Sequence, residues 1–129
     1  MSADIKPWII KAEEDYLVAI KLSKSAVPFY NSVCFHCQQC IEKYMKNIMA
    51  KENIDIIKSH DLKLLLGLIE SRVPALKLIK KELTNITDWA VNARYPGVVS
   101  DKNDAKLGVD TMKLVRKIIR GYLGLKSRK

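Results

Sequence analysis

Residues 35–46 place side chains that could bind a ligand or move a proton inside a segment with the spacing of a buried helix. One face of that helix is apolar or weakly polar, and it consists of Cys34, Cys37, Ile41, Tyr44 and Ile48. A neighbouring face carries a polar stripe that consists of His36, Gln39, Lys43 and Lys46. The stripe is either the wall of a binding groove or a solvated face beside the core, and the sequence leaves both interpretations open.

Two histidines, His36 and His60, are the candidates for general acid–base chemistry, because imidazole titrates near neutral pH. His36 lies inside the segment above, and His60 precedes an apolar run that begins at Leu62. Only the packing of their two helices can therefore bring them together. No serine or cysteine arrangement in the sequence forms a recognisable triad with them. Each histidine is interpreted as a residue that binds or orients a ligand or lies at the surface, with catalysis as the alternative.

The chain has three cysteines, Cys34, Cys37 and Cys40, at a spacing that invites comparison with metal sites. Iron–sulfur motifs of similar spacing lie in irregular loops that let the thiolates converge. Here the intervening residues favour a helix, on which the three sulfurs spread around part of the circumference. No second cysteine cluster offers a zinc site, and an odd number of cysteines argues against a disulfide framework. We therefore predict packing cysteines, and we expect no metal and no cofactor.

The charge of the chain favours an anionic partner. Its 129 residues have a formal net charge of +9 and a sequence pI near 9.5, values that favour RNA, DNA, a nucleotide or an acidic protein. The last predicted helix carries a basic stripe that consists of Lys106, Lys113, Arg116, Lys117 and Arg120. This stripe either neutralises phosphates or only keeps the helix soluble, and both alternatives stay open.

Several familiar signals are missing from the sequence. It contains no apolar run of about 18 residues, so no transmembrane helix and no membrane partner are expected. Residues 1–4 do not begin a signal peptide, and a cytoplasmic location is expected. The sequence has no Gly-rich phosphate loop, no HExxH and no Gly-x-Ser-x-Gly elbow, so a familiar enzyme is not indicated.

The apolar periodicity predicts five helices, which cover residues 3–26, 29–51, 59–72, 75–92 and 102–123. Pro28 and Pro74 separate neighbouring helices, and Ser59 or Asp61 can cap the third one. Asp15 falls on the apolar face of the first helix, either as a satisfied buried acid or as a charge that reaches a partner helix. The short connections predict an all-α fold, an antiparallel up-and-down helical bundle that forms one domain over residues 1–129.

Three segments together resemble the HEPN family (higher eukaryotes and prokaryotes nucleotide-binding). Residues 34–46 are similar to the family's Phe-His-x-Gln-Gln-x-x-Glu-Lys-x-x-Lys helix. Residues 59–62 are similar to its His-x-Leu helix start, and residues 93–97 to its Arg-Tyr-Pro turn. The order and separation of the segments also fit, so the resemblance spans nearly the whole chain.

The resemblance implies a helical bundle that forms a homodimer and acts on or with a nucleotide or RNA. Many prokaryotic members of the family are encoded beside a minimal nucleotidyltransferase and act with it as a toxin–antitoxin or similar paired module. The resemblance therefore also implies a nucleotidyltransferase partner. Carried over to this sequence, with His36 added from the polar stripe, the ligand-binding groove consists of His36, Gln39, Glu42, Lys43, His60, Arg94 and Tyr95. Lys43 and Arg94 are the residues expected to contact phosphate, and Tyr95 could stack on a base.

One departure from the family concerns catalysis. Ribonuclease branches of the family use an arginine followed four to six residues later by a histidine, at a composite dimer site. Both histidines of this chain precede Arg72, its first arginine, so that motif is absent. We therefore expect a non-catalytic module that binds a nucleotide or RNA phosphate and pairs with a nucleotidyltransferase. The alternatives are a ribonuclease toxin with His36 or His60 in a non-standard site, and a purely structural partner of an acidic protein.

Overall fold

The computed structural model describes residues 4–86, 96–97 and 99–125. These residues form helices and connections, with no β-strand among them. In chain order the helices are α1 (Lys6–Ser23), α2 (Tyr30–Lys51), α3 (Leu62–Ile69), the 3₁₀ helix η1 (Pro74–Ile79), α4 (Lys80–Ile86) and α6 (Lys102–Tyr122). The prediction of an all-α bundle is confirmed. No helix among the described residues is long and apolar enough to cross a bilayer.

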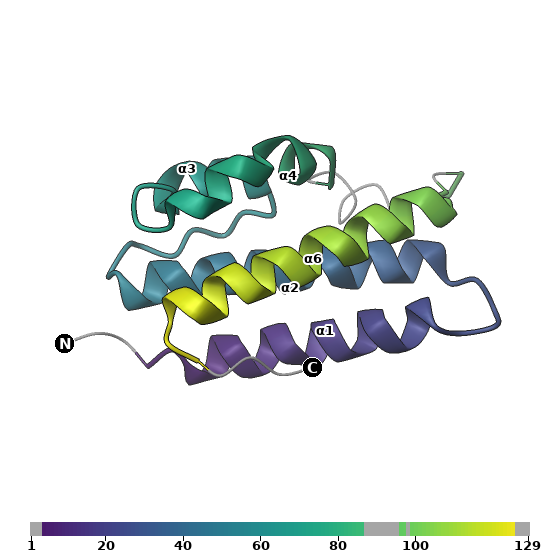
Figure 1. The fold of residues 1–129 in the computed structure, drawn as a ribbon, viewed down its shortest axis with the longest axis horizontal. Helices are drawn as coiled ribbons and strands as arrows, with labels where there is room; N and C mark the ends of the chain where they lie inside the picture. Colours follow the sequence, from purple (N-terminus) through teal and green to yellow (C-terminus); the bar gives the residue numbers. More distant parts are fainter. Residues whose placement is uncertain (1–3, 87–95, 98, 126–129) are drawn as a thin grey trace.

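The three long helices lie side by side, and α3, η1 and α4 cover one side of them (Figure 1). α1 runs antiparallel to α2 and α6, which run in the same direction. The backbone N–H of Ser100 donates to Asn31 Oδ1 at 2.6 Å, so α2 and α6 begin together. They also end together, where the hydroxyl of Tyr122 donates to Glu52. The segment from α3 to α4 therefore lies between two long helices in sequence and returns the chain to its starting end.

Helix boundaries follow local capping chemistry. Asp61 caps α3 by accepting hydrogen bonds from the backbone N–H groups of Lys63 and Leu64. Asp101 and Asp104 form a capping box at the start of α6, which begins at the predicted residue. α1 is shorter than predicted at both ends.

The region around Pro74 differs from the prediction of one helix over residues 75–92. α3 already ends at Ile69, and Val73, the residue before the proline, lies outside the helical region with φ −129° and ψ 72°. The chain then makes the 3₁₀ helix η1 before it becomes regular in α4. The expected apolar side is nevertheless buried, and in the described part it consists of Leu76, Ile79, Leu83 and Ile86. Residues 87–92 lie outside the described part of the chain.

α2 is the centre of the core, because α1, α3 and α6 all pack against it. The three cysteines of α2 are fully buried, as predicted for packing residues. Burial raises the pKa of the Cys34 thiol to about 11 and also raises the pKa values of Cys37 and Cys40. Thiols protonated in this way are poor metal ligands, since metals bind the thiolate. Among the described residues, no group of three or more His, Cys, Asp or Glu side chains could hold a metal ion.

Candidate binding site on α2

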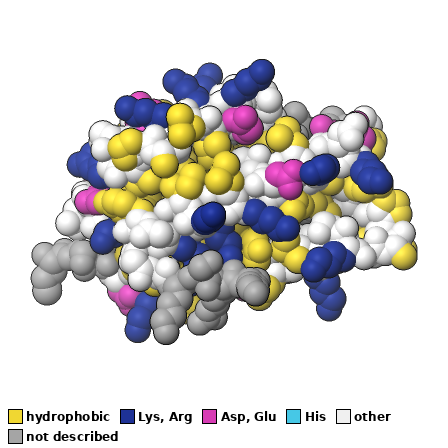
Figure 2. Space-filling model, in the orientation of Figure 1, with side chains coloured by type: hydrophobic (Ala, Val, Ile, Leu, Met, Phe, Trp, Pro, Cys, Tyr) yellow, Lys and Arg dark blue, Asp and Glu magenta, His cyan; other side chains and the backbone are white. Residues whose placement is uncertain are grey.

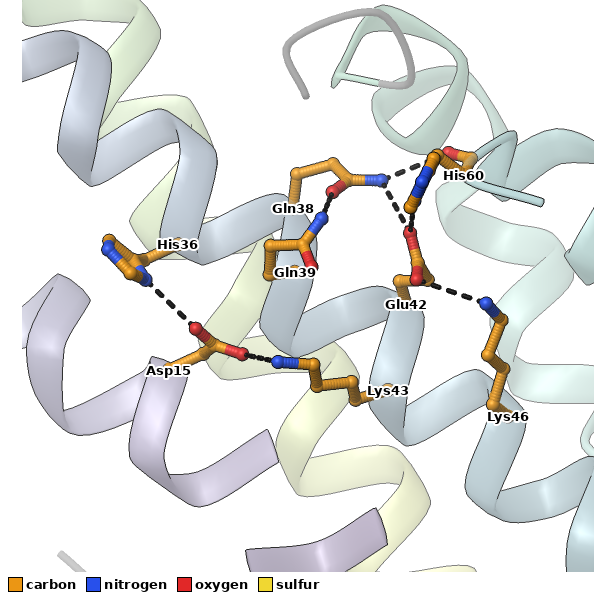
Figure 3. A network of polar contacts seen from close by, with 8 residues as sticks. All are labelled: Asp15, His36, Gln38, Gln39, Glu42, Lys43, Lys46 and His60. Atoms are coloured by element: carbon orange, nitrogen blue, oxygen red, sulfur yellow. Dashed lines mark hydrogen bonds and ion pairs between the residues drawn. The ribbon is translucent and has the colours of Figure 1, made fainter. Parts of the chain in front are cut away.

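Asp15 of α1 joins two residues of the polar stripe on α2. Its Oδ1 lies 2.9 Å from His36 Nδ1, and its Oδ2 accepts a hydrogen bond from the ammonium group of Lys43 (Figure 3). Asp15 is buried, so it needs such partners to offset the loss of hydration. It is therefore both a satisfied buried acid and a charge that reaches the neighbouring helix.

Glu42 organises a second cluster, between α2 and the start of α3. Its Oε1 lies 2.7 Å from His60 Nδ1, and its Oε2 accepts a hydrogen bond of 3.1 Å from Lys46 Nζ. Gln38 Nε2 donates to Glu42 Oε1 at 3.3 Å and to the backbone carbonyl of His60 at 3.0 Å. The loop before α3 is thus fixed to α2 through both the side chain and the backbone of His60.

Gln39 connects to the second cluster by donating from Nε2 to Gln38 Oε1 at 2.8 Å. We use the name α2 polar network for the residues drawn in Figure 3, which are Asp15, His36, Gln38, Gln39, Glu42, Lys43, Lys46 and His60. Five of the seven predicted site residues belong to this network. The other two, Arg94 and Tyr95, lie outside the described residues.

The structure also adds residues that the predicted site did not include. Lys46 appeared in the polar stripe but is almost fully buried beside Glu42. Gln38 holds both Glu42 and the His60 backbone. Asp15 was recognisable only as an acid on an apolar helix face, and the sequence could not show which basic residues it meets.

The histidines of the network are more exposed than its two carboxylates, Asp15 and Glu42, which are both buried. The side chain of His60 is 48% exposed, whereas that of Glu42 is 5% exposed. His36 and Lys43 are partly exposed, at 28% and 23%. Each imidazole is oriented by a carboxylate at Nδ1, an arrangement that suits a positioned hydrogen-bonding group or a general base. The amide of Gln39 adds a donor and an acceptor of the type that reads base edges.

A separate network joins α1, α2 and α6 through Glu13. Arg116 binds Glu13 through two hydrogen bonds, of 2.8 Å from Nε to Oε2 and 2.7 Å from Nη2 to Oε1. The hydroxyl of Tyr44 donates to Glu13 Oε2 at 2.6 Å, and Arg120 donates to the Tyr44 oxygen at 3.3 Å. The guanidinium of Arg116 also lies over the ring of Tyr16, 4.2 Å from its centre.

This network corrects the interpretation of the last helix as one basic stripe. Arg116 and Arg120 are buried, while Lys106, Lys113 and Lys117 are exposed. The two arginines turn inward because the carboxylate of Glu13 on α1 needs charged partners at this depth. They are not part of a solvent-facing phosphate stripe.

The Glu13 network predicts a loss of stability in acid. Burial alone would raise the pKa of Glu13, but hydrogen bonds from Arg116 and Tyr44 and the nearby arginine charges outweigh it and keep this pKa below its ordinary value. Ionised Glu13 therefore stabilises the fold above its unfolded-state pKa, and this contribution is lost as the pH falls through the lower folded-state pKa.

Urea unfolding of the wild type and of Glu13→Gln tests this dependence. The difference in unfolding free energy between the two proteins is expected to be large at about pH 7 and to be smaller at an acidic pH below the folded-state pKa, because the wild-type carboxyl is then also neutral. A difference that is the same at both pH values would show that the charge of Glu13 does not stabilise the fold.

The fold and the α2 polar network define a helical-bundle domain with one carboxylate-held histidine on its central helix and another in the loop before α3. The sequence profile of the HEPN domain matches residues 5–122, and the chain belongs to this family. Among solved structures, the crystal structure of an archaeal HEPN homologue has a TM-score of 0.70 with this chain. That match has 24% sequence identity and covers 94% of this chain and 98% of the homologue, so it supports the fold. A search of curated proteins returned no match.

Proposed function

We propose that this HEPN domain is a non-catalytic module that binds a nucleotide or an RNA phosphate. The observation that carries the proposal is the pairing of half-exposed His60 with buried Glu42, at the predicted site and beside the Gln38 and Gln39 amides. A ligand at this place meets a preoriented imidazole and an amide, which together can recognise a base edge or a ribose. Arg94, Lys43 and Tyr95 remain the proposed contacts for phosphate and for base stacking.

The absence of the family's arginine–histidine motif from the sequence supports a binding role rather than cleavage by the usual mechanism. Lys43 and Lys46 are each neutralised by a carboxylate, so the network itself is nearly balanced in charge when both histidines are neutral. Such a site favours positioning through hydrogen bonds over attraction to phosphate alone.

In this proposal the domain forms a homodimer and pairs with a minimal nucleotidyltransferase, as the resemblance implies. Ile10 and Leu17 of α1 are 66% and 65% exposed, and they are seven residues apart on one helix face. They line a pocket of about 590 Å³ next to the Glu13 network. Exposed apolar side chains of this size are typical of surfaces that meet another protein.

Binding measurements with fluorescein-labelled RNA test the proposed site. Arg94→Ala and His60→Ala are each expected to weaken binding by about tenfold, on the order of 1–2 kcal/mol for a hydrogen bond or charge contact. Lys21→Ala is the control, because Lys21 is a cation on α1 that is exposed and lies outside the proposed site. Unchanged affinity in both site variants would remove these residues from the ligand site.

The second candidate function is a ribonuclease with a non-standard site. The observation that favours it is the carboxylate on Nδ1 of each histidine, since the same arrangement orients imidazole bases in hydrolytic enzymes. This candidate requires RNA cleavage by the wild type that disappears in His60→Ala.

A further inference from the structure

The surface formed by residues 62–86 carries more exposed cations than acids. Both acids of this segment, Glu70 and Glu82, are only partly exposed. We call the exposed basic residues the α3–α4 basic face, and they are Lys63, Arg72, Lys77, Lys80 and Lys81. None of the ion pairs found among the described residues involves residues 62–86. The positive charges of this face are therefore exposed to solvent.

Other helices of the molecule mix both signs of charge. On α6, exposed Lys106 forms an ion pair of 2.8 Å with exposed Asp110 one turn away. On α1, exposed Glu14 lies among exposed lysines. A helix kept soluble by charge normally shows such mixing, so a face with one sign of charge calls for a different explanation.

Three lysines of the face are concentrated where η1 continues into α4. Lys77 is three residues before Lys80 and four residues before Lys81, so all three project from the same turn. Figure 2 shows Lys and Arg side chains along the edge of the molecule that α3 and α4 form. Like charges this close repel one another, and an anion with several charges removes that repulsion.

The composition of the segment indicates what kind of anion fits. Residues 62–86 contain no Phe, Tyr, Trp or His, so the face has no platform on which unpaired bases could stack. A double helix needs no stacking platform, because its phosphates lie in rows on the outside. The first residue of the face, Lys63, is three residues after half-exposed His60, so the face lies next to the proposed ligand site in the chain.

Two exposed leucines on the face suggest an acidic protein as the alternative partner. Leu78 is 86% exposed and Leu64 is 50% exposed, within the basic face. Protein interfaces, however, are depleted in lysine, and leucine is under-represented among the residues that dominate their binding energy. A surface rich in lysine and lacking aromatic anchors therefore fits a phosphate backbone better than a protein.

We propose that the α3–α4 basic face binds the phosphate backbone of a double-stranded nucleic acid. This inference rests on the proposed function, because it adds contacts along the phosphate backbone to the ligand contacts proposed for the α2 polar network. Binding through the backbone depends strongly on salt and only weakly on base sequence.

The test is fluorescence anisotropy with an RNA duplex of about 20 base pairs, the DNA duplex of the same sequence, and one RNA strand alone, each at several salt concentrations. The test variant is Lys77→Ala/Lys80→Ala/Lys81→Ala. The control is Lys106→Ala/Lys113→Ala/Lys117→Ala, which removes the same number of exposed lysines from α6. Leu78→Ser probes the rival partner. All substituted side chains are exposed, so thermal unfolding is expected to stay close to that of the wild type.

The wild type is expected to bind a duplex more tightly than the single strand. The test variant should lose about tenfold or more in duplex affinity, and its plot of log affinity against log salt should flatten by about 3 in slope. The control and Leu78→Ser should keep the wild-type slope. Equal affinities for the RNA duplex and the DNA duplex would indicate contacts with the backbone phosphates alone. A higher affinity for the RNA duplex would indicate contacts with its 2′-hydroxyls.

Three outcomes would overturn the inference. Equal losses in the two triple variants would show an effect of net charge alone, and a large loss in Leu78→Ser would indicate an apolar protein-type surface. If the duplex affinity is unchanged in the test variant but lower in His60→Ala, the basic face is rejected and the proposed function is retained. No binding to any of the three nucleic acids, together with no binding to mononucleotides, would reject both.

Discussion

Glu13→Ala is expected to lower the free energy of unfolding by about 3 kcal/mol, which corresponds to a fall of about 10 °C in Tm for a domain of this size. The substitution removes the carboxylate that joins α1 to Arg116 and Arg120 of α6 and to Tyr44 of α2. Arg116 would then remain buried with its main charge partner gone. An uncompensated buried charge destabilises a protein far more than the loss of an exposed ion pair.

Glu14→Ala is the matched control for Glu13→Ala. It changes the same residue type in the same helix, one position further along, where the side chain is exposed. Its effect on the unfolding free energy is expected to stay within about 0.5 kcal/mol. Thermal and urea unfolding of both variants measure the difference, and equal effects would show that the Glu13 network does not hold the three helices together.

Glu42→Met is the second change expected to have a large effect, also about 3 kcal/mol. Glu42 and Lys46 are both buried, and without the carboxylate of Glu42 the ammonium group of Lys46 loses its ion-pair partner. Gln38 and His60 also lose an acceptor, so the loop that leads into α3 loses one of its attachments to α2.

A double-mutant cycle with Lys46→Met separates these effects. Replacing both members of a buried pair by apolar side chains removes the unpaired charge, so the double variant should be more stable than the sum of the single changes predicts. We expect a coupling energy of about 1–3 kcal/mol. Additive effects would mean that the ion pair of Glu42 and Lys46 does not stabilise the fold.

The helical architecture could be predicted from the sequence because it depends on local signals. Apolar spacing located α2 within one residue of its observed bounds, and it placed the start of α6 at Lys102, directly after the Asp101 cap that the structure shows. The region after Pro74 could not be predicted as well, because apolar spacings of three and four residues suit a 3₁₀ turn and an α-helix alike. Leu76 and Ile79 are buried in either conformation.

The candidate site was predictable in its residues but not in their pairings. The polar stripe and the helix start at His60 identified most of the network, yet the sequence could not show that Asp15 meets His36 and Lys43. The same limit explains the error on α6. Spacing placed Arg116 and Arg120 with three lysines, but only the packing of α1 decides which cations turn toward Glu13.

The most direct test of the binding role is one gel, in which excess wild-type protein is incubated with labelled RNA at two salt concentrations and scored for both mobility shift and cleavage. We expect a shift that weakens at the higher salt concentration while the RNA stays intact. Cleaved RNA in the wild-type lanes, with cleavage lost in His60→Ala, would contradict the non-catalytic role and establish a nuclease with a non-standard site.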